Sequence, residues 1–336
     1  MDWDLLGHEW AAHLLQQHVA RQEARHAYLF AGPPGAGRRS LALRFAQAIN
    51  CTQPPQPGIP CRSCRNCSQI ERLQHPDLSI LQSDPDNRTI KVEAVRELQR
   101  SLSLAPYQAG YRVALLLRFQ DATPSAQNAL LKTLEEAPPR VILLLTADSP
   151  DVLLPTIVSR CEVLRLRPLA PEALAAALQE RWKLPADQAR QLAHLSGGRV
   201  GQALQLHNHP ELLEQHQAWI AEGFDLLTMK RRERFAYVEK LTKDGDRDKL
   251  RAVLQAWLSL WRDVMLAAAS MVAAGTASDL ANLRFESQIR QLGESTGLPA
   301  AAACTAAVEK ALLGLDLSLN ARLLLEVLML DWPHLS

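Results

Sequence analysis

The chain has 336 residues, more than a single hydrophobic core usually fills, so we expect two or three domains. Its 37 lysine and arginine residues nearly balance its 36 aspartate and glutamate residues, and 47% of all residues are hydrophobic. This balance indicates a folded soluble protein and excludes a polycationic protein that coats DNA. Any contact with nucleic acid must therefore come from local clusters of charge.

The N-terminus and the hydropathy pattern predict neither export nor membrane insertion. Residues 1–10 carry acidic side chains where a signal peptide would carry basic ones, and no apolar segment follows them. The longest weakly polar stretch, 264–277, is shorter than the roughly 18 to 20 residues of a membrane span. Four of the six cysteines lie within 51–67, a spacing that favours a metal site over a disulfide framework. We expect a cytoplasmic protein.

The first half of the chain alternates predicted strands and helices. Residues 27–31 form a short apolar strand, followed by a loop rich in glycine and proline and then a helical pattern over 40–50. After an insertion rich in proline and cysteine at 51–67, further strands are predicted at 78–81, 113–117 and 141–146, with helices at 92–104 and 125–136. Such alternation predicts a parallel α/β sheet.

Beyond Arg167 the pattern is helical. Two short helices are predicted over 168–182 and 185–195, and a third follows a break at 196–198. Long amphipathic helices then continue to Trp332, and we interpret the charge run at 230–234 as a solvated helix face. The sequence therefore predicts three domains, an α/β domain (1–166, with the insertion at 51–67), a small helical lid domain (167–208) and an all-helical domain (209–336).

The loop after the first strand has the glycine framework of a Walker A motif. Gly32, Gly35 and Gly37 precede a predicted helix, and in that motif backbone N–H groups cradle phosphates at the helix N-terminus. The motif then requires Lys and Ser or Thr, whereas this chain has Arg38 and Arg39, which cannot ligate Mg²⁺. A plain surface turn is the alternative, which the preceding strand and following helix disfavour.

Two later segments carry a resemblance to a known family. Residues 113–117 and the string Asn-Ala-Leu-Leu-Lys-Thr-Leu-Glu-Glu at 128–136 resemble the Walker B strand and following helix of bacterial DNA polymerase III clamp-loader subunits, which are AAA+ proteins. Where their ATPase members carry the Mg²⁺-binding Asp and the catalytic Glu, this chain has Arg118 and Phe119, and the nearest acid, Asp121, is expected to point elsewhere. Because phosphoryl transfer needs a metal to neutralise charge, we expect neither ATP/Mg²⁺ binding nor hydrolysis. The family contains one type of subunit with such a degenerate site.

The segment 156–161 matches the Ser-Arg-Cys motif of this family. The resemblance implies that Arg160 reaches the γ-phosphate of ATP held by a neighbouring subunit, for which a permanently charged, forked guanidinium is suited. Such arginine fingers accelerate hydrolysis by about 10³ to 10⁵. A solvated surface arginine is the alternative. Residues 146–148 fall in the sensor 1 region, and Arg199 falls at the sensor 2 position, where we expect structural or interface contacts.

Four cysteines, Cys51, Cys61, Cys64 and Cys67, have the spacing of a metal site. Four thiolates close a tetrahedral Zn²⁺ shell and leave no open position for catalysis, so we predict one structural zinc ion, and the resemblance includes a zinc module at this place. Separate buried thiols are the alternative. The prolines of the segment disfavour folding without the metal. His75 is interpreted as part of a structural turn.

The resemblance covers almost the whole chain and implies an AAA+ domain, a helical lid and a collar domain, in which 320–330 resembles the last collar helix. It implies a hetero-pentamer with delta and gamma/tau subunits that loads a sliding clamp onto primed DNA through sequence-independent phosphate contacts. Two alternatives stay open. One is an active gamma/tau-like ATPase, disfavoured by Arg38, Arg118 and Phe119, and the other is a stand-alone zinc-dependent DNA-binding protein, disfavoured by the lack of a strongly basic domain.

Overall fold

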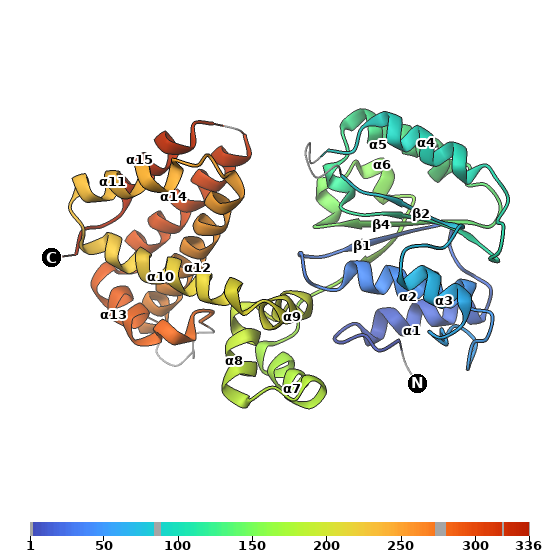
Figure 1. The fold of residues 1–336 in the computed structure, drawn as a ribbon, viewed down its shortest axis with the longest axis horizontal. Coiled ribbons are helices and arrows are strands. Elements are labelled where there is room, and N and C mark those ends of the chain that lie inside the picture. The colour runs from blue at the N-terminus through green and yellow to red at the C-terminus, as the bar shows by residue number, and fades with distance from the viewer. Residues whose placement is uncertain (1–2, 84–88, 273–279, 318, 336) are drawn as a thin grey trace. The chain divides into compact units, whose positions relative to one another are not determined.

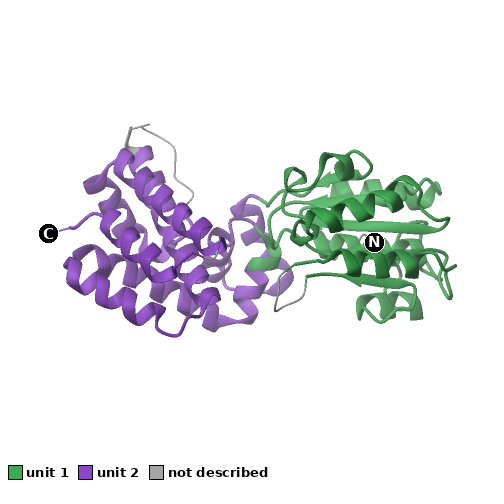
Figure 2. Ribbon diagram, turned by 90° about the horizontal axis from the view of Figure 1, so that it is seen from above, with its two compact units in different colours: residues 1–169, 199–202 green, residues 170–198, 203–336 purple. Residues whose placement is uncertain are grey.

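The computed structural model describes residues 3–83, 89–272, 280–317 and 319–335. The chain divides into two compact units, drawn in different colours in Figure 2. Unit 1 comprises residues 1–169 and 199–202, and unit 2 comprises 170–198 and 203–336. The further division of the helical part into a lid and a collar stays a prediction.

Unit 1 contains a five-stranded parallel sheet with the strand order β2-β3-β4-β1-β5 (Figure 1). The strands are β1 (Ala27–Ala31), β2 (Leu78–Leu81), β3 (Arg112–Leu116), β4 (Val141–Ala147) and β5 (Glu162–Arg165). Every residue of β1, β3 and β4 is buried, as expected for strands covered on both faces. The predicted parallel α/β sheet is therefore confirmed. The edge strand β5 was missed, because its four residues carry charges at both ends and form no apolar run.

Helices cover both faces of the sheet, as Figure 1 shows. On one face lie α1 (Glu9–Ala20), α2 (Arg38–Asn50) and α3 (Arg65–Glu71), and on the other lie α4 (Val92–Leu102), α5 (Pro124–Glu135) and α6 (Pro155–Val158), with the short 3₁₀ helices η1 (Phe119–Asp121) and η2 (Pro150–Val152) between elements. Side chains along β1 point alternately to the two faces of the sheet, and each face has its own hydrophobic core. Tyr28 and Phe30 pack with Phe45 of α2 on one face, whereas Leu29 packs toward α4 and α5 on the other.

The register of the sheet brings three loops to one edge. Ala31 at the end of β1 pairs with Ala147 at the end of β4, and Leu116 of β3 pairs with Leu145 of β4. Because the strands are parallel, the segments that follow β1, β3 and β4 all leave from the carboxyl edge. In open parallel sheets this edge is where ligands bind.

In its described residues unit 2 is entirely helical, as predicted for the second half of the chain. Its helices are α7 (Pro171–Trp182), α8 (Ala186–Leu195), α9 (Val200–Asn208, which begins within unit 1), α10 (Pro210–Thr228), α11 (Arg231–Thr242), α12 (Arg247–Val272), η3 (Leu283–Phe285), α13 (Glu286–Thr296), α14 (Leu298–Asp316) and α15 (Ala321–Asp331). Trp257, Trp261 and Trp332 meet edge to face in its core, with ring centroids 5.1 and 5.4 Å apart.

Among the described helices, α14 is long and apolar enough, by length and composition, to cross a membrane. One such helix is weak evidence, because a core helix of a soluble protein passes the same test. Ala301, Cys304 and Val308 of α14 belong to the core of unit 2. The stretch 264–277, singled out in the sequence, extends beyond the described residues at 273–277.

Candidate functional site

The glycine-rich loop lies between β1 and α2, in the strand–loop–helix order that the sequence predicts. Gly35 and Gly37 have φ angles of 82° and 94°, in the left-handed region that favours glycine. At Gly32 a Cβ atom would lie 2.4 Å from the carbonyl oxygen of Leu166, so only glycine fits. The glycines therefore serve this backbone path whether or not a phosphate binds there.

The loop is held by contacts from within unit 1. The N–H of Gly201 donates to the carbonyl of Gly35 at 2.8 Å. A second contact joins His8 Nε2 to the carbonyl of Ala36 at 2.5 Å, and because a carbonyl only accepts, Nε2 must carry the proton. Both contacts use carbonyl groups of the loop, so they fix its backbone path without occupying the N–H groups that a Walker A loop turns toward phosphate.

Arg38, at the place of the Walker lysine, is buried and paired. Its side chain is only 9% exposed, and Nη1 donates to Oδ1 of Asp148 at 2.6 Å. Asp148 follows β4 in the predicted sensor 1 region, so the pair joins the loops after β1 and β4. A guanidinium neutralised by a carboxylate has less charge to offer a phosphate. Arg39 is exposed.

Arg118 and Phe119 follow β3 at the same edge of the sheet, and they point in different directions. The N–H of Arg118 donates to Thr146 Oγ1 at 2.8 Å, and its Nε donates to Oδ2 of Asp121 at 3.0 Å. This hydrogen bond raises the pKa of Arg118. Asp121 also accepts from Ser83 Oγ at 3.1 Å.

The side chains of Asp121 and Phe119, which follow β3, can be compared with what the sequence predicts. Asp121, which is expected to point away from the place of the Mg²⁺-binding carboxylate, pairs with Arg118. The ring of Phe119 is fully buried among the residues under α4 and α5, so it fills the core rather than the place of a carboxylate. Side-chain direction after a strand end depends on the 3₁₀ turn η1, which the sequence pattern did not predict.

Arg160 lies two residues after the end of α6, on the surface of unit 1. Its side chain is 36% exposed; Nη1 donates to the carbonyl of Thr156 at 3.0 Å, and Nη2 donates to Oε1 of Glu135 at 2.7 Å. Burial raises the pKa of the adjacent Cys161 to about 12, so this partly buried thiol stays protonated near neutral pH. Burial also lowers the pKa of Arg199, at the predicted sensor 2 position.

The four cysteines of the insertion converge. The sulfur atoms of Cys51, Cys61, Cys64 and Cys67 all lie within 4.8 Å of one another. A tetrahedral shell with Zn–S bonds of about 2.3 Å places its sulfurs about 3.8 Å apart, so the cluster fits one zinc ion. Backbone N–H groups of Cys61 and Cys64 donate to the preceding sulfurs at 3.3 and 3.2 Å. Although burial opposes it, the hydrogen bond from Cys67 N–H helps to lower the pKa of Cys64 to about 6, whereas burial raises the pKa of Cys51 and of Cys67. Metal binding would therefore have to displace protons from Cys51 and Cys67.

The insertion is attached firmly to its surroundings. Gln47 of α2 donates to the carbonyl of Cys67 at 2.8 Å, and Asn66 donates to the carbonyl of Asn50 at 2.9 Å. From the N-terminal segment, Trp3 donates to the carbonyl of Gly58 at 2.9 Å. The cysteine cluster therefore joins the N-terminal segment to α2, the helix that begins at the glycine-rich loop.

Comparison with known proteins identifies the family of this chain. A family model described as "DNA polymerase III, delta subunit" matches residues 7–170. Over 254 residues the chain is 30% identical to the DNA polymerase III subunit delta' of Bacillus subtilis, a match that covers 75% of each protein. The chain belongs to the delta-prime family of DNA polymerase III subunits. It is also 34% identical over 219 residues to the Pseudomonas aeruginosa delta' subunit, which covers 64% of this chain and 65% of that relative.

DNA polymerase III subunits named tau or gamma match a shorter part of the chain. The subunit tau of Escherichia coli is 36% identical over 179 residues, which covers 52% of this chain and 27% of tau. Over the matched residues the identity to tau is as high as the identity to the two delta' subunits, so identity alone does not separate the two kinds of subunit. The side chains at the carboxyl edge of the sheet must make that distinction.

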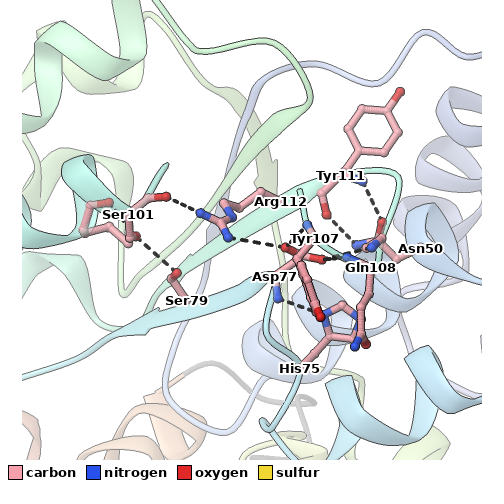
Figure 3. A network of polar contacts seen from close by, with 11 residues as sticks. Asn50, His75, Asp77, Ser79, Ser101, Tyr107, Gln108, Tyr111 and Arg112 are labelled. Carbon is pink, nitrogen blue, oxygen red and sulfur yellow. Dashed lines mark hydrogen bonds and ion pairs between the residues drawn. The ribbon is translucent and has the colours of Figure 1, made fainter. Parts of the chain in front are cut away.

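Sequence analysis missed a buried polar network around Asp77, which Figure 3 shows. The Asp77 carboxylate accepts the backbone N–H groups of Tyr107, Gln108 and Ala109 at 2.7 to 2.9 Å and lies 3.4 Å from Arg112 Nη2. Although burial opposes it, these backbone hydrogen bonds lower the pKa of Asp77. The N–H of Asp77 donates to His75 Nδ1 at 3.0 Å, in line with a structural turn at His75. The network fixes the loop before β3 in this delta-prime chain.

Proposed function

We propose that this chain is a clamp-loader subunit that does not hydrolyse ATP and that supplies Arg160 to the ATP of a neighbouring gamma/tau subunit. The complex, a hetero-pentamer with delta and gamma/tau subunits, would place a sliding clamp on primed DNA during replication in the cytoplasm. Membership of the delta-prime family supports the assignment to DNA polymerase III. The observation that carries the proposal is the Arg38–Asp148 pair at the degenerate Walker A loop.

Chemistry at the carboxyl edge favours a site without hydrolysis. ATP hydrolysis needs Mg²⁺ beside the phosphates and a carboxylate that positions water. Asp148 and Asp121 lie at this edge, and guanidinium groups pair with both of them, through Arg38 and Arg118. A cation at each position repels Mg²⁺ instead of binding it. The degenerate loop Gly32–Arg39 is therefore proposed to bind no ATP/Mg²⁺.

An ATPase assay and calorimetry test whether the chain binds or hydrolyses ATP. The purified chain should show no Mg²⁺-dependent ATPase and no calorimetric binding of ATP, with the tau subunit measured alongside as the active control. The identity with tau favours an active ATPase as the second candidate function. Turnover similar to that of tau, abolished in Arg38→Ala, would establish that candidate instead.

The position of Arg160 is suited to action on another subunit. It lies at the surface after a four-residue helix and carries a permanent charge. The proposed role is transition-state stabilisation at the neighbour's γ-phosphate. Arg160→Ala should leave the complex assembled, as size-exclusion chromatography would report, and lower its DNA-stimulated ATPase.

An apolar surface on the last two helices supports assembly through the proposed collar. Leu313 and Leu317 at the end of α14 are 63% and 75% exposed, and Leu323, Val327 and Leu330 of α15 are also exposed. Residues 323, 327 and 330 repeat at helical spacing, so they share one face of α15. Contiguous exposed apolar patches of this kind mark protein interfaces. Leu323→Asp should therefore weaken co-purification with the delta and gamma/tau subunits.

The zinc ion is proposed to be structural. Cys51, Cys61, Cys64 and Cys67 would hold it, and an all-cysteine shell supplies charge neutralisation and cross-linking rather than catalysis. Elemental analysis should find about one zinc per chain.

The alternative of a stand-alone zinc-dependent DNA-binding protein has a test of its own. Salt-dependent binding of the isolated chain to primed DNA would favour that alternative.

A further inference from the structure

We propose that Glu135 is a positioning residue for Arg160. The inference rests on the proposed function of Arg160 and deepens it, because it names a second residue on which the action in trans depends. The contact that motivates it is the 2.7 Å hydrogen bond from Arg160 Nη2 to Glu135 Oε1. The two residues are far apart in sequence, and they meet because α5 and α6 pack together.

Two anchors define the plane of the guanidinium. Nη1 donates to the carbonyl of Thr156 at 3.0 Å, within the turn that precedes Arg160, and Nη2 donates to Glu135. An arginine side chain has several rotatable bonds and samples many rotamers when only one nitrogen is held. With two different nitrogens bonded, the planar group keeps one orientation. Thr156 lies in α6, only four residues before Arg160, whereas Glu135 comes from a different helix, α5.

A buried glutamine joins α5 and α6, the two helices that carry the anchors. The side chain of Gln127, buried in α5, accepts the N–H of Leu154 at 3.0 Å and donates to the carbonyl of Ala122 at 3.2 Å. Leu154 is the residue that precedes α6. A buried amide with both ends bonded therefore holds the start of α6 against α5, the helix that ends at Glu135.

The exposure of the pair decides what it can do. The side chains of Arg160 and Glu135 are 36% and 51% exposed, so water screens their attraction and the pair contributes little to folding. For the same reason a triphosphate, with its larger charge, can share or replace the carboxylate when the neighbour's nucleotide approaches. The pair therefore orders the guanidinium before it meets the phosphate, which lowers the entropy lost at that step.

Single-turnover ATP hydrolysis by the complex reconstituted with delta and gamma/tau subunits tests the inference. Glu135→Ala should slow the phase that depends on Arg160 by about three- to tenfold, the range for one side chain that is no longer ordered in advance. Glu135→Gln should fall in between, since its amide oxygen still accepts a hydrogen bond. The melting temperature of Glu135→Ala and the KM for ATP should stay at the wild-type values. The control is Glu136→Ala, which removes the same charge from the same exposed helix end and should leave the rate unchanged.

A double variant separates this inference from the proposed function. In an Arg160→Ala background, Glu135→Ala should have no further effect if it acts through the guanidinium. If Arg160→Ala itself leaves the rate unchanged, the proposed function fails. If Arg160→Ala slows hydrolysis but Glu135→Ala matches or exceeds the wild-type rate, or slows the Arg160→Ala complex further, only the positioning role is overturned.

Discussion

Arg38 donates to Asp148 at 2.6 Å and thereby joins the first residue of α2 to the segment after β4. The guanidinium is nearly buried, whereas the carboxylate is 39% exposed. Water can therefore hydrate the Asp148 carboxylate but hardly reaches the guanidinium. In this chain the cation after the glycine-rich loop has a structural partner.

Arg38→Ala should destabilise unit 1 by about 1 kcal/mol, because it removes a charge-assisted hydrogen bond whose acceptor can still be hydrated. Arg39→Ala is the matched control, since Arg39 is the adjacent, exposed arginine, and its effect should stay within about 0.5 kcal/mol. Urea unfolding of the purified chains measures both. Equal effects of the two variants would contradict a structural role for the Arg38–Asp148 pair.

Arg234 should be a larger contributor to the stability of unit 2. Its side chain is 3% exposed, and it donates to backbone carbonyls at the ends of two helices and in the C-terminal tail, namely Leu227, Met329, Trp332 and Pro333. Arg234→Met would remove the donor of the Met329, Trp332 and Pro333 carbonyls, whereas the Leu227 carbonyl would keep the N–H of Leu335. We expect a loss of about 3 kcal/mol or more. The exposed Arg232→Met should be nearly neutral in the same denaturant titration. A small effect at Arg234 would mean that water readily replaces the guanidinium.

The Asp77 network predicts a specific pH dependence. The pKa of Asp77 is lowered in the folded state, so its contribution to the free energy of unfolding is complete above the unfolded pKa of about 4 and is lost as the pH falls through the folded pKa. Asp77→Asn should cost about 2 kcal/mol at pH 7, and this difference should shrink below pH 4. Thermal or urea unfolding at a series of pH values tests the sign. A difference that grows toward acid pH would contradict it.

Removal of zinc should affect the N-terminal part of unit 1. Cys64→Ser/Cys67→Ser or a strong chelator should release about one zinc per chain and loosen the contacts of Trp3 with Gly58 and of Gln47 with Cys67. We expect faster proteolysis within 52–60 and a lower melting temperature. Cys304→Ala, which changes a buried thiol of unit 2, should keep its zinc. Full zinc content in the double variant would rule out the four-cysteine site.

The elements were predictable where the apolar pattern is strong, and the site was predictable where short motifs lie next to those elements. The buried strands β1, β3 and β4 and the cysteine cluster belong to this class. Partners that lie far apart in sequence could not be predicted, because nothing local indicates that Glu135 meets Arg160 or that Gly201 meets Gly35. The interpretation of 230–234 as a solvated face was wrong for its last residue. Arg234 is a buried arginine that carbonyl groups satisfy, and composition cannot distinguish such a residue from an exposed one.

The central claim is that this delta-prime chain acts on ATP held by a neighbour through Arg160. Single-turnover ATP hydrolysis by the reconstituted complex, with primed DNA and clamp present, compares the wild type with Arg160→Ala most directly. The account predicts that hydrolysis at the adjacent gamma/tau site slows by about 10³ while the complex stays assembled. An unchanged rate and amplitude in the assembled Arg160→Ala complex would contradict it.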